Sequence, residues 1–104
     1  MEQPRAARVP TSLRALYTLE RSDFEGTVVD LSRSGAKVET ALNRVPDRDA
    51  RIRLFIAGSS DRQIELEARV ARHTGHGFGA QFMATPVELL ELLADLGGSP
   101  LSQE

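Results

Sequence analysis

The residues best suited to binding chemistry are the polar segment Asp30-Leu31-Ser32-Arg33-Ser34-Gly35 and two arginines upstream of it, Arg5 and Arg8. A guanidinium group binds phosphates and planar groups better than an ammonium group does, because its N–H donors form a rigid fork. Asp and Ser are also ordinary turn residues, whose side chains bond to nearby backbone groups. Taken alone, the polar segment is therefore weak evidence for a site.

The other candidate residues argue against catalysis. His73 and His76 could supply two metal ligands, but no neighbouring carboxylate supports them, and we expect solvated histidines in a turn. Gly75, Gly77 and Gly79 resemble part of a glycine-rich loop, but the helix that follows such a loop is missing, so close strand packing is favoured. No serine has a histidine base placed to activate it. We therefore expect no enzyme activity, no catalytic residue and no metal.

Composition narrows the class of protein further. The chain has 104 residues, 13 of them basic and 15 acidic, with a net charge of −2 and no cysteine. This length suits one domain, and the lack of cysteine excludes disulfides and thiolate metal sites. A net negative charge argues against DNA binding. Since neither a secretory signal nor a long apolar segment is found, we expect no membrane insertion and a cytoplasmic location.

The charge is unevenly distributed along the chain. All basic residues except Lys37 are arginines, and residues 1–14 hold three of them against one glutamate. Residues 86–104 are acidic and contain no basic residue. Two interpretations of the basic N-terminal segment stay open. Composition favours a solubilising tail, and the alternative is an arm that closes over an anion.

Hydrophobic patterning predicts strands along most of the chain. Residues 1–12 contain Pro4 and Pro10 and are expected to form a flexible, extended leader. The segment from Gln63 to His73 is long enough for a helix, but its strict alternation of apolar and polar residues favours a strand. Gly35 is free to take a positive φ in the turn before the third strand. The predicted strands are residues 13–19, 24–31, 36–40, 51–56, 63–73 and 78–82.

A single helix is predicted at residues 86–96. Thr85, Pro86 and Glu88 match a Thr-x-x-Glu capping box with proline in the first turn. Gly97 and Gly98 end the helix, and residues 98–104 are expected to fray. Six strands and a helix predict a mainly β fold, a small antiparallel barrel over residues 13–97 with the helix covering one opening. The broad apolar face of the helix could also dock a partner or form a weak homodimer.

The arginines, the segment Asp-x-Ser-x-x-Gly and the order of the elements together resemble the PilZ domain family, from Arg5 to about Leu96. The family pattern is Arg-x-x-x-Arg followed by Asp/Asn-x-Ser-x-x-Gly, and Asp30, Ser32 and Gly35 match its second half. The resemblance implies a six-stranded split barrel with a C-terminal helix that serves as a receptor for cyclic di-GMP. The expected partners are cyclic di-GMP and a regulated protein, with the domain a monomer or a weak homodimer.

The resemblance also implies the ligand-binding residues. The arginines would bind a phosphate or the O6/N7 edge of guanine, and Asp30 would accept hydrogen bonds from guanine N–H groups. Ser32 would bond to a phosphate or a base edge, and Gly35 would let the backbone approach the ligand. The ligand-binding residues implied are Arg5, Arg8, Asp30, Ser32 and Gly35, with additional contacts from Val9, Arg33 and Gly79.

One feature departs from the family pattern. The first arginine should lie four residues before Arg8, where Pro4 stands, whereas Arg5 is only three residues before it. In an extended segment, a shift of one residue turns the side chain to the other face. Two functions therefore stay open. The chain is either a cyclic di-GMP receptor that signals to a protein partner, or a degenerate domain with weak or no nucleotide binding that acts as a protein-interaction module.

Overall fold

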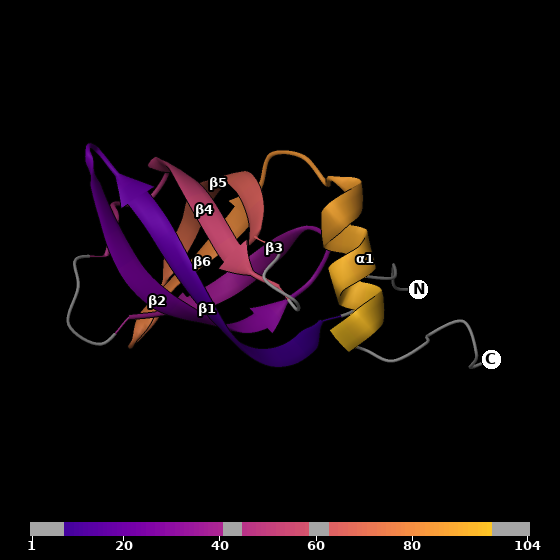
Figure 1. Ribbon diagram of the computed structural model, residues 1–104. Coiled ribbons are helices and arrows are strands. Elements are labelled where there is room, and N and C mark those ends of the chain that lie inside the picture. Colours follow the sequence, from indigo (N-terminus) through magenta and orange to yellow (C-terminus); the bar gives the residue numbers. More distant parts are fainter. Residues whose placement is uncertain (1–7, 41–44, 59–62, 97–104) are drawn as a thin grey trace, which may run out of the picture.

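A computed structural model describes residues 8–40, 45–58 and 63–96 of the chain, which form six strands followed by one helix (Figure 1). Every strand pairs antiparallel to its neighbours, and the sheet closes into a barrel in the order β1-β2-β3-β6-β5-β4. The predicted fold class is thus confirmed. The elements are β1 (Val9–Leu19), β2 (Ser22–Leu31), β3 (Gly35–Glu39), β4 (Arg51–Ala57), β5 (Gln63–His73), β6 (Gly77–Phe82) and α1 (Val87–Leu96).

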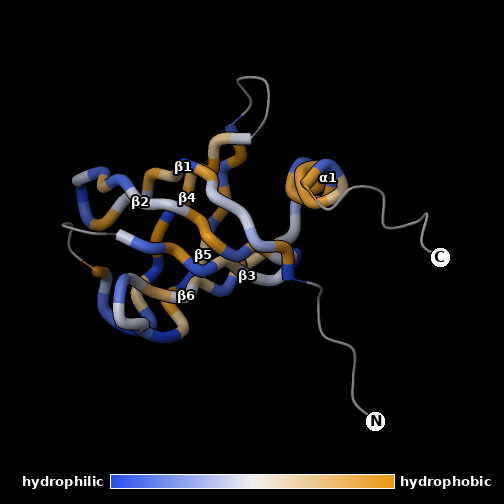
Figure 2. Tube along the Cα trace, turned by 90° about the horizontal axis from the view of Figure 1, so that it is seen from below, coloured by the Kyte–Doolittle hydropathy of each residue, from blue (hydrophilic) through white to orange (hydrophobic). Residues whose placement is uncertain are grey.

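The barrel encloses an apolar core because most of its strands alternate between buried and more exposed residues. The alternation is strictest in β5, where Ile64, Leu66, Ala68 and Val70 are buried. Figure 2 shows the same alternation as changes of colour along the strands. Near the centre of the core, the ring of Tyr17 meets that of Phe78 edge-on at 5.1 Å and stacks on Phe24 at 5.7 Å.

The helix α1 lies at one end of the barrel, and the turn between β1 and β2 lies at the other end (Figure 1). Leu89 and Leu92 are buried in the core. Val87 and Leu90 were expected on the same apolar face, but they are 60% and 43% exposed. The helix therefore buries a narrower stripe than its leucine content suggested. Among the described helical residues, none belongs to a segment long and apolar enough to cross a membrane.

The first strand begins at Val9, earlier than the predicted start at Leu13. Val9 and Pro10 pair with Leu31 and Asp30 of β2, and the register then shifts by one residue before Leu13. The hydroxyl of Thr11, inside this irregularity, donates a hydrogen bond to the carbonyl of Val28. A bulge of this kind accommodates the proline, which interrupts regular pairing. Residues 1–7 of the predicted leader and the predicted tail, 98–104, lie outside the described residues.

The helix also starts differently from the prediction. It begins at Val87, and the carbonyl of Pro86 accepts hydrogen bonds from the N–H groups of Leu89 and Leu90, at 3.0 and 3.4 Å. Pro86 therefore supplies the first carbonyl that accepts a helical hydrogen bond, whereas the capping box predicted Thr85 as the N-cap. Thr85 has a long-range role instead, because its hydroxyl donates to the carbonyl of Arg33 at 3.1 Å.

Glycines sit where β3 and β6 approach each other most closely. A Cβ on Gly35 would stand 2.4 Å from the carbonyl oxygen of Ala80, and one on Gly77 would stand 1.9 Å from that of Val38. Gly35 does not use the positive φ that glycine permits, since its φ lies outside the left-handed region. The residue is needed because no side chain fits between the two strands.

We predict that Gly77→Ala lowers the free energy of unfolding by at least about 2 kcal/mol, because a backbone carbonyl cannot move aside as a side chain can. The matched control is Gly75→Ala in the neighbouring turn, where a Cβ would meet nothing within 4 Å. Thermal unfolding followed by circular dichroism should show a melting temperature at least about 8 °C lower for Gly77→Ala only. Equal melting temperatures for the two variants would contradict the prediction.

Candidate functional site

Most of the predicted site residues lie where β1 begins, β2 ends and β3 begins. Val9 pairs with Leu31 and Pro10 with Asp30, so the antiparallel pairing brings Arg8 beside Asp30. The guanidinium Nη1 of Arg8 donates to Oδ2 of Asp30 at 2.9 Å. The fold thus joins the two halves of the family pattern in one contact. The other predicted arginine, Arg5, lies outside the described residues.

The two partners of this ion pair differ in exposure. The side chain of Arg8 is 58% exposed and that of Asp30 is 26% exposed. Among the described residues, the second carboxylate oxygen of Asp30, Oδ1, is buried and has no hydrogen-bond partner. Buried polar atoms are nearly always paired in folded proteins. Oδ1 of Asp30 can therefore accept a hydrogen bond from a ligand, and it lies beside the largely exposed guanidinium of Arg8.

Ser32 is occupied within its own turn. Its side-chain oxygen accepts hydrogen bonds from the backbone N–H groups of Ser34 and Gly35, both at 3.2 Å, and the residue is only 5% exposed. Its backbone N–H donates to the carbonyl of Gly35 at 2.9 Å. The hydroxyl organises the turn between β2 and β3. The sequence indicated this common role of serine, and the structure shows it in detail.

The turn is also tied to the opposite end of the chain. The N–H of Phe82 donates to the carbonyl of Ser34 at 2.9 Å, and Thr85 bonds to the carbonyl of Arg33. The Arg33 side chain is exposed. The turn that follows Asp30 is thus held from two sides, by β6 and by the segment that leads into α1.

Two further positions lie on the outer face next to Asp30. Lys37 of β3 pairs directly with Asp30, and Gly79 of β6 pairs with Lys37. Gly79, a predicted additional contact, thus lies in β6, two strands away from Asp30. Lys37 was not among the predicted site residues. The alternation of Ala36, Lys37 and Val38 places it on the outer face, which is the signal that could have identified it.

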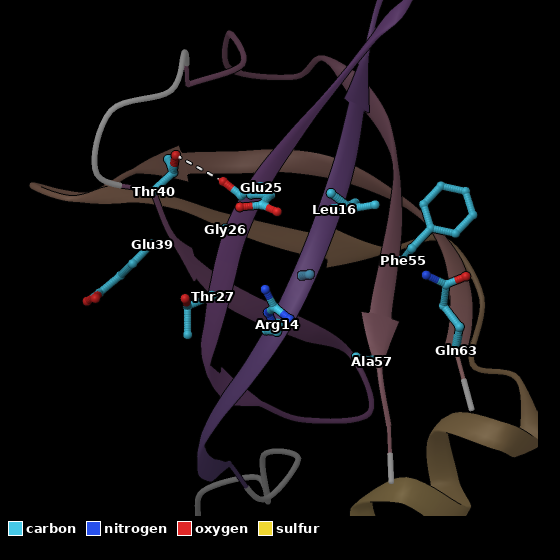
Figure 3. A pocket seen from close by; sticks show the side chains of 11 residues that line it. Arg14, Leu16, Glu25, Gly26, Thr27, Glu39, Thr40, Phe55, Ala57 and Gln63 are labelled. Atoms are coloured by element: carbon cyan, nitrogen blue, oxygen red, sulfur yellow. Dashed lines mark hydrogen bonds between the residues drawn. The ribbon is translucent and has the colours of Figure 1, made fainter. Parts of the chain in front are cut away.

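One hollow of the described surface lies away from these residues. It has a volume of about 640 Å³ and is lined mostly by residues of β1, β2, β3, β4 and β5, including Arg14, Leu16, Thr27 and Phe55 (Figure 3). It contains none of the predicted site residues. Its lining mixes apolar and charged side chains without an unpartnered buried polar atom among them. The region around Arg8 and Asp30 is therefore the better candidate site.

The two histidines differ in their surroundings. Nε2 of His73 lies 2.8 Å from the carbonyl oxygen of Pro46, so this ring anchors a loop rather than facing solvent freely. His76 is exposed. Within the described ranges, no group of three or more His, Asp or Glu residues is placed to hold a metal ion.

Comparisons with known proteins agree with this architecture. The structure resembles the Bacillus subtilis inhibitor of motility, MotI/DgrA, with a TM-score of 0.80 and 18% identity, covering 100% of this chain and 54% of that chain. It also resembles the PilZ domain of CeSA from a cellulose-synthesizing bacterium, with a TM-score of 0.69 and 14% identity, covering 89% and 97% of the two chains. The chain therefore spans about half the length of MotI/DgrA.

At these identities the structural likenesses establish the fold. No curated protein matches the sequence. The model of the PilZ domain matches residues 2–96, a range that includes Arg5, Arg8 and the whole segment from Asp30 to Gly35. Because this match covers most of the sequence, the chain belongs to the PilZ domain family, a family of cyclic di-GMP receptors.

Proposed function

We propose that this domain binds cyclic di-GMP between Arg8 and Asp30 and signals its presence to a protein partner. The observation that carries the proposal is the contact of Arg8 with Asp30, whose second carboxylate oxygen is buried without a partner. The family match supports the choice of ligand. Since cyclic di-GMP is an intracellular messenger, this function requires a cytoplasmic location.

The chemistry of the pair suits a guanine and a phosphate. Guanine presents N–H donors on one edge and the O6 and N7 acceptors on another, so a carboxylate and a guanidinium can bind different edges. In this arrangement, Oδ1 of Asp30 accepts from a guanine N–H. Arg8 exchanges part of its contact with Asp30 for a phosphate or for O6/N7. The exchange costs little, because a surface ion pair contributes about 1 kcal/mol or less to stability.

The surrounding residues support this contact in different ways. Ser32 fixes the turn through its bonds to Ser34 and Gly35, so we assign it a positioning role in addition to any direct ligand bond. Val9 continues the pairing of β1 with β2 beside the ligand, and the exposed side chain of Arg33 is free to reach it. In the family pattern a second arginine upstream of Arg8 also binds the ligand, and we assign this contact to Arg5.

We assign the contact with a protein partner to the region of α1. The turn that follows Asp30 is bonded to Thr85, just before the helix, through the carbonyl of Arg33. Near this link, Met83, Val87 and Leu90 are 48%, 60% and 43% exposed. An exposed apolar group of this kind is typical of a protein contact. One structural neighbour is an inhibitor of motility, which shows a regulatory use of a similar fold.

The degenerate-domain alternative rests on a separate observation. The spacing of Arg5 and Arg8 is shorter than the family pattern requires, so one of the two arginine contacts could be lost. In that case the exposed apolar residues at and before α1 would be the functional surface, and the domain would act by protein contact without a nucleotide. Binding measurements on the wild-type chain separate the two functions.

We predict that isothermal titration calorimetry detects cyclic di-GMP binding by the wild-type chain and that Arg8→Ala and Asp30→Asn each weaken it at least about tenfold. A bidentate arginine contact contributes roughly 1–3 kcal/mol, and tenfold corresponds to about 1.4 kcal/mol. The control variant is Arg21→Gln in the remote turn between β1 and β2, with affinity expected to be unchanged. Absence of both heat and amide shifts in the wild type at high ligand concentration would rule out the receptor function.

A second prediction concerns the irregular arginine spacing. We expect Arg5→Ala to weaken cyclic di-GMP binding less than Arg8→Ala does, because Arg5 stands one residue away from the position at which the family pattern has its first arginine. Titration of both variants under the same conditions gives the comparison. A loss for Arg5→Ala equal to or greater than that for Arg8→Ala would show that the leader restores the family geometry.

A further inference from the structure

Three β-bulges of the barrel fall on one row of residues that crosses the outer face. The register shifts after Pro10 in β1, between Val28 and Asp30 in β2, and between Val70 and Arg72 in β5. Bulges are common next to functional sites, where they redirect a side chain. The row consists of directly paired residues from five strands, Pro10, Asp30, Lys37, Gly79 and Arg72.

Each of the bulges in β2 and β5 places a charged residue on this row. Val28 pairs with Val38, so regular pairing would put Val29 opposite Lys37, but the bulge puts Asp30 there. In the same way, Val70 pairs with Ala80, and the bulge puts Arg72 rather than Ala71 opposite Gly79. Without the two extra residues, the row would carry valine in place of Asp30 and alanine in place of Arg72. The irregularities thus create a charged row.

The row faces solvent. Residues directly opposite each other in an antiparallel pair have side chains on the same face. Ala36, Val38 and Phe78 flank the row along the strands and are buried in the core, so the row lies on the outer face of the barrel. The row also includes Asp30, and therefore continues the surface that holds Arg8.

Two cations flank a bare stretch of backbone in this row. Gly79 has no side chain, and a Cβ built on it would lie 3.5 Å from both Cγ and Nε of Arg72, so the arginine lies across the glycine. Lys37 stands on the other side. With strands about 4.8 Å apart, the two Cα atoms are separated by roughly 10 Å. Between them lies a strip one strand wide, with the backbone of Gly79 as its floor and the Arg72 side chain lying over it.

Lys37 and Arg72 also differ from neighbouring cations in their pairing. Arg53 forms a salt bridge with Glu65 at 3.1 Å, and Arg69 donates to the side chain of Gln81 at 3.0 Å. No described carboxylate pairs with Lys37 or Arg72. The end of β5 is held in place because His73 is bonded to the carbonyl of Pro46. The Arg72 backbone is thus fixed while its guanidinium is available.

We propose that Lys37 and Arg72 bind a phosphate of the nucleotide over Gly79, next to the guanine held by Asp30. This inference rests on the proposed function and extends it, because neither cation belongs to the Arg-x-x-x-Arg or Asp-x-Ser-x-x-Gly pattern. Lys37 supplies a compact charge, and Arg72 supplies a fork of N–H donors that matches two phosphate oxygens. The bulges in β2 and β5 place the guanine-binding and phosphate-binding groups on one row.

Charge-neutralising variants test the proposal. We expect Lys37→Gln and Arg72→Gln each to weaken cyclic di-GMP binding about tenfold and to make the dependence of affinity on salt concentration shallower, because each removes a phosphate contact. Arg21→Gln removes an exposed arginine from the turn at the far end of the barrel and should change neither quantity. Weaker binding with an unchanged salt dependence would contradict a phosphate contact.

A steric variant tests whether the ligand lies over Gly79, without a change of charge. Gly79→Ala adds a methyl group that makes ordinary contact with Arg72 and clashes with no backbone atom. We expect an unchanged melting temperature and an affinity lowered several-fold, whereas the control Gly75→Ala should retain wild-type affinity. Wild-type affinity in Gly79→Ala would show that the ligand does not lie over this strip.

The outcomes distinguish this inference from the function on which it rests. If the wild-type chain does not bind cyclic di-GMP, the receptor function itself fails. If the wild type binds, and Arg8→Ala and Asp30→Asn lose affinity while Lys37→Gln and Arg72→Gln do not, the receptor function stands and the phosphate site is overturned. Loss of affinity in all four variants, with shallower salt dependence for the lysine and arginine variants, supports both.

Discussion

The close approach of β3 and β6 is the constraint on which the rest of the structure depends. The described strands form two three-stranded meanders, β1-β2-β3 and β4-β5-β6, which meet at two seams, β1 with β4 and β3 with β6. Gly35 and Gly77 make the approach possible, because a Cβ at either position would run into a facing carbonyl. The same pairing brings Lys37 of one meander beside Gly79 of the other. The pairing of β3 with β6 therefore helps to enclose the core and also assembles the outer surface next to Asp30.

Much of the fold was predictable because the strands alternate regularly. Gln63–His73 was assigned correctly to its last residue, since four inward residues in strict alternation leave little ambiguity. The errors fall where a long-range contact overrides a local rule. Pro10 lies in a strand because Asp30 pairs with it across a bulge, and Thr85 serves the turn after β2 rather than the start of its own helix. Local sequence carries no signal for either contact.

The site was predictable in part for a similar reason. Asp30, Ser32 and Gly35 were identified by their pattern, and the structure places Arg8 against Asp30. The steric reason for glycine at position 35 could not be found from the sequence. It is the carbonyl of Ala80, in a strand forty-odd positions further along the chain. Lys37 and Arg72 belong to no motif, and only the registers of β2, β3, β5 and β6 reveal that they share a row with Asp30.

The bond between Thr85 and the turn has a consequence for sequence variation. The donor is a side-chain hydroxyl, whereas the acceptor is the backbone carbonyl of Arg33. Any residue at position 33 supplies that carbonyl, but only threonine or serine at position 85 supplies an equivalent hydroxyl. A substitution at position 33 therefore leaves this tether in place, whereas a substitution of Thr85 by a residue other than serine removes it.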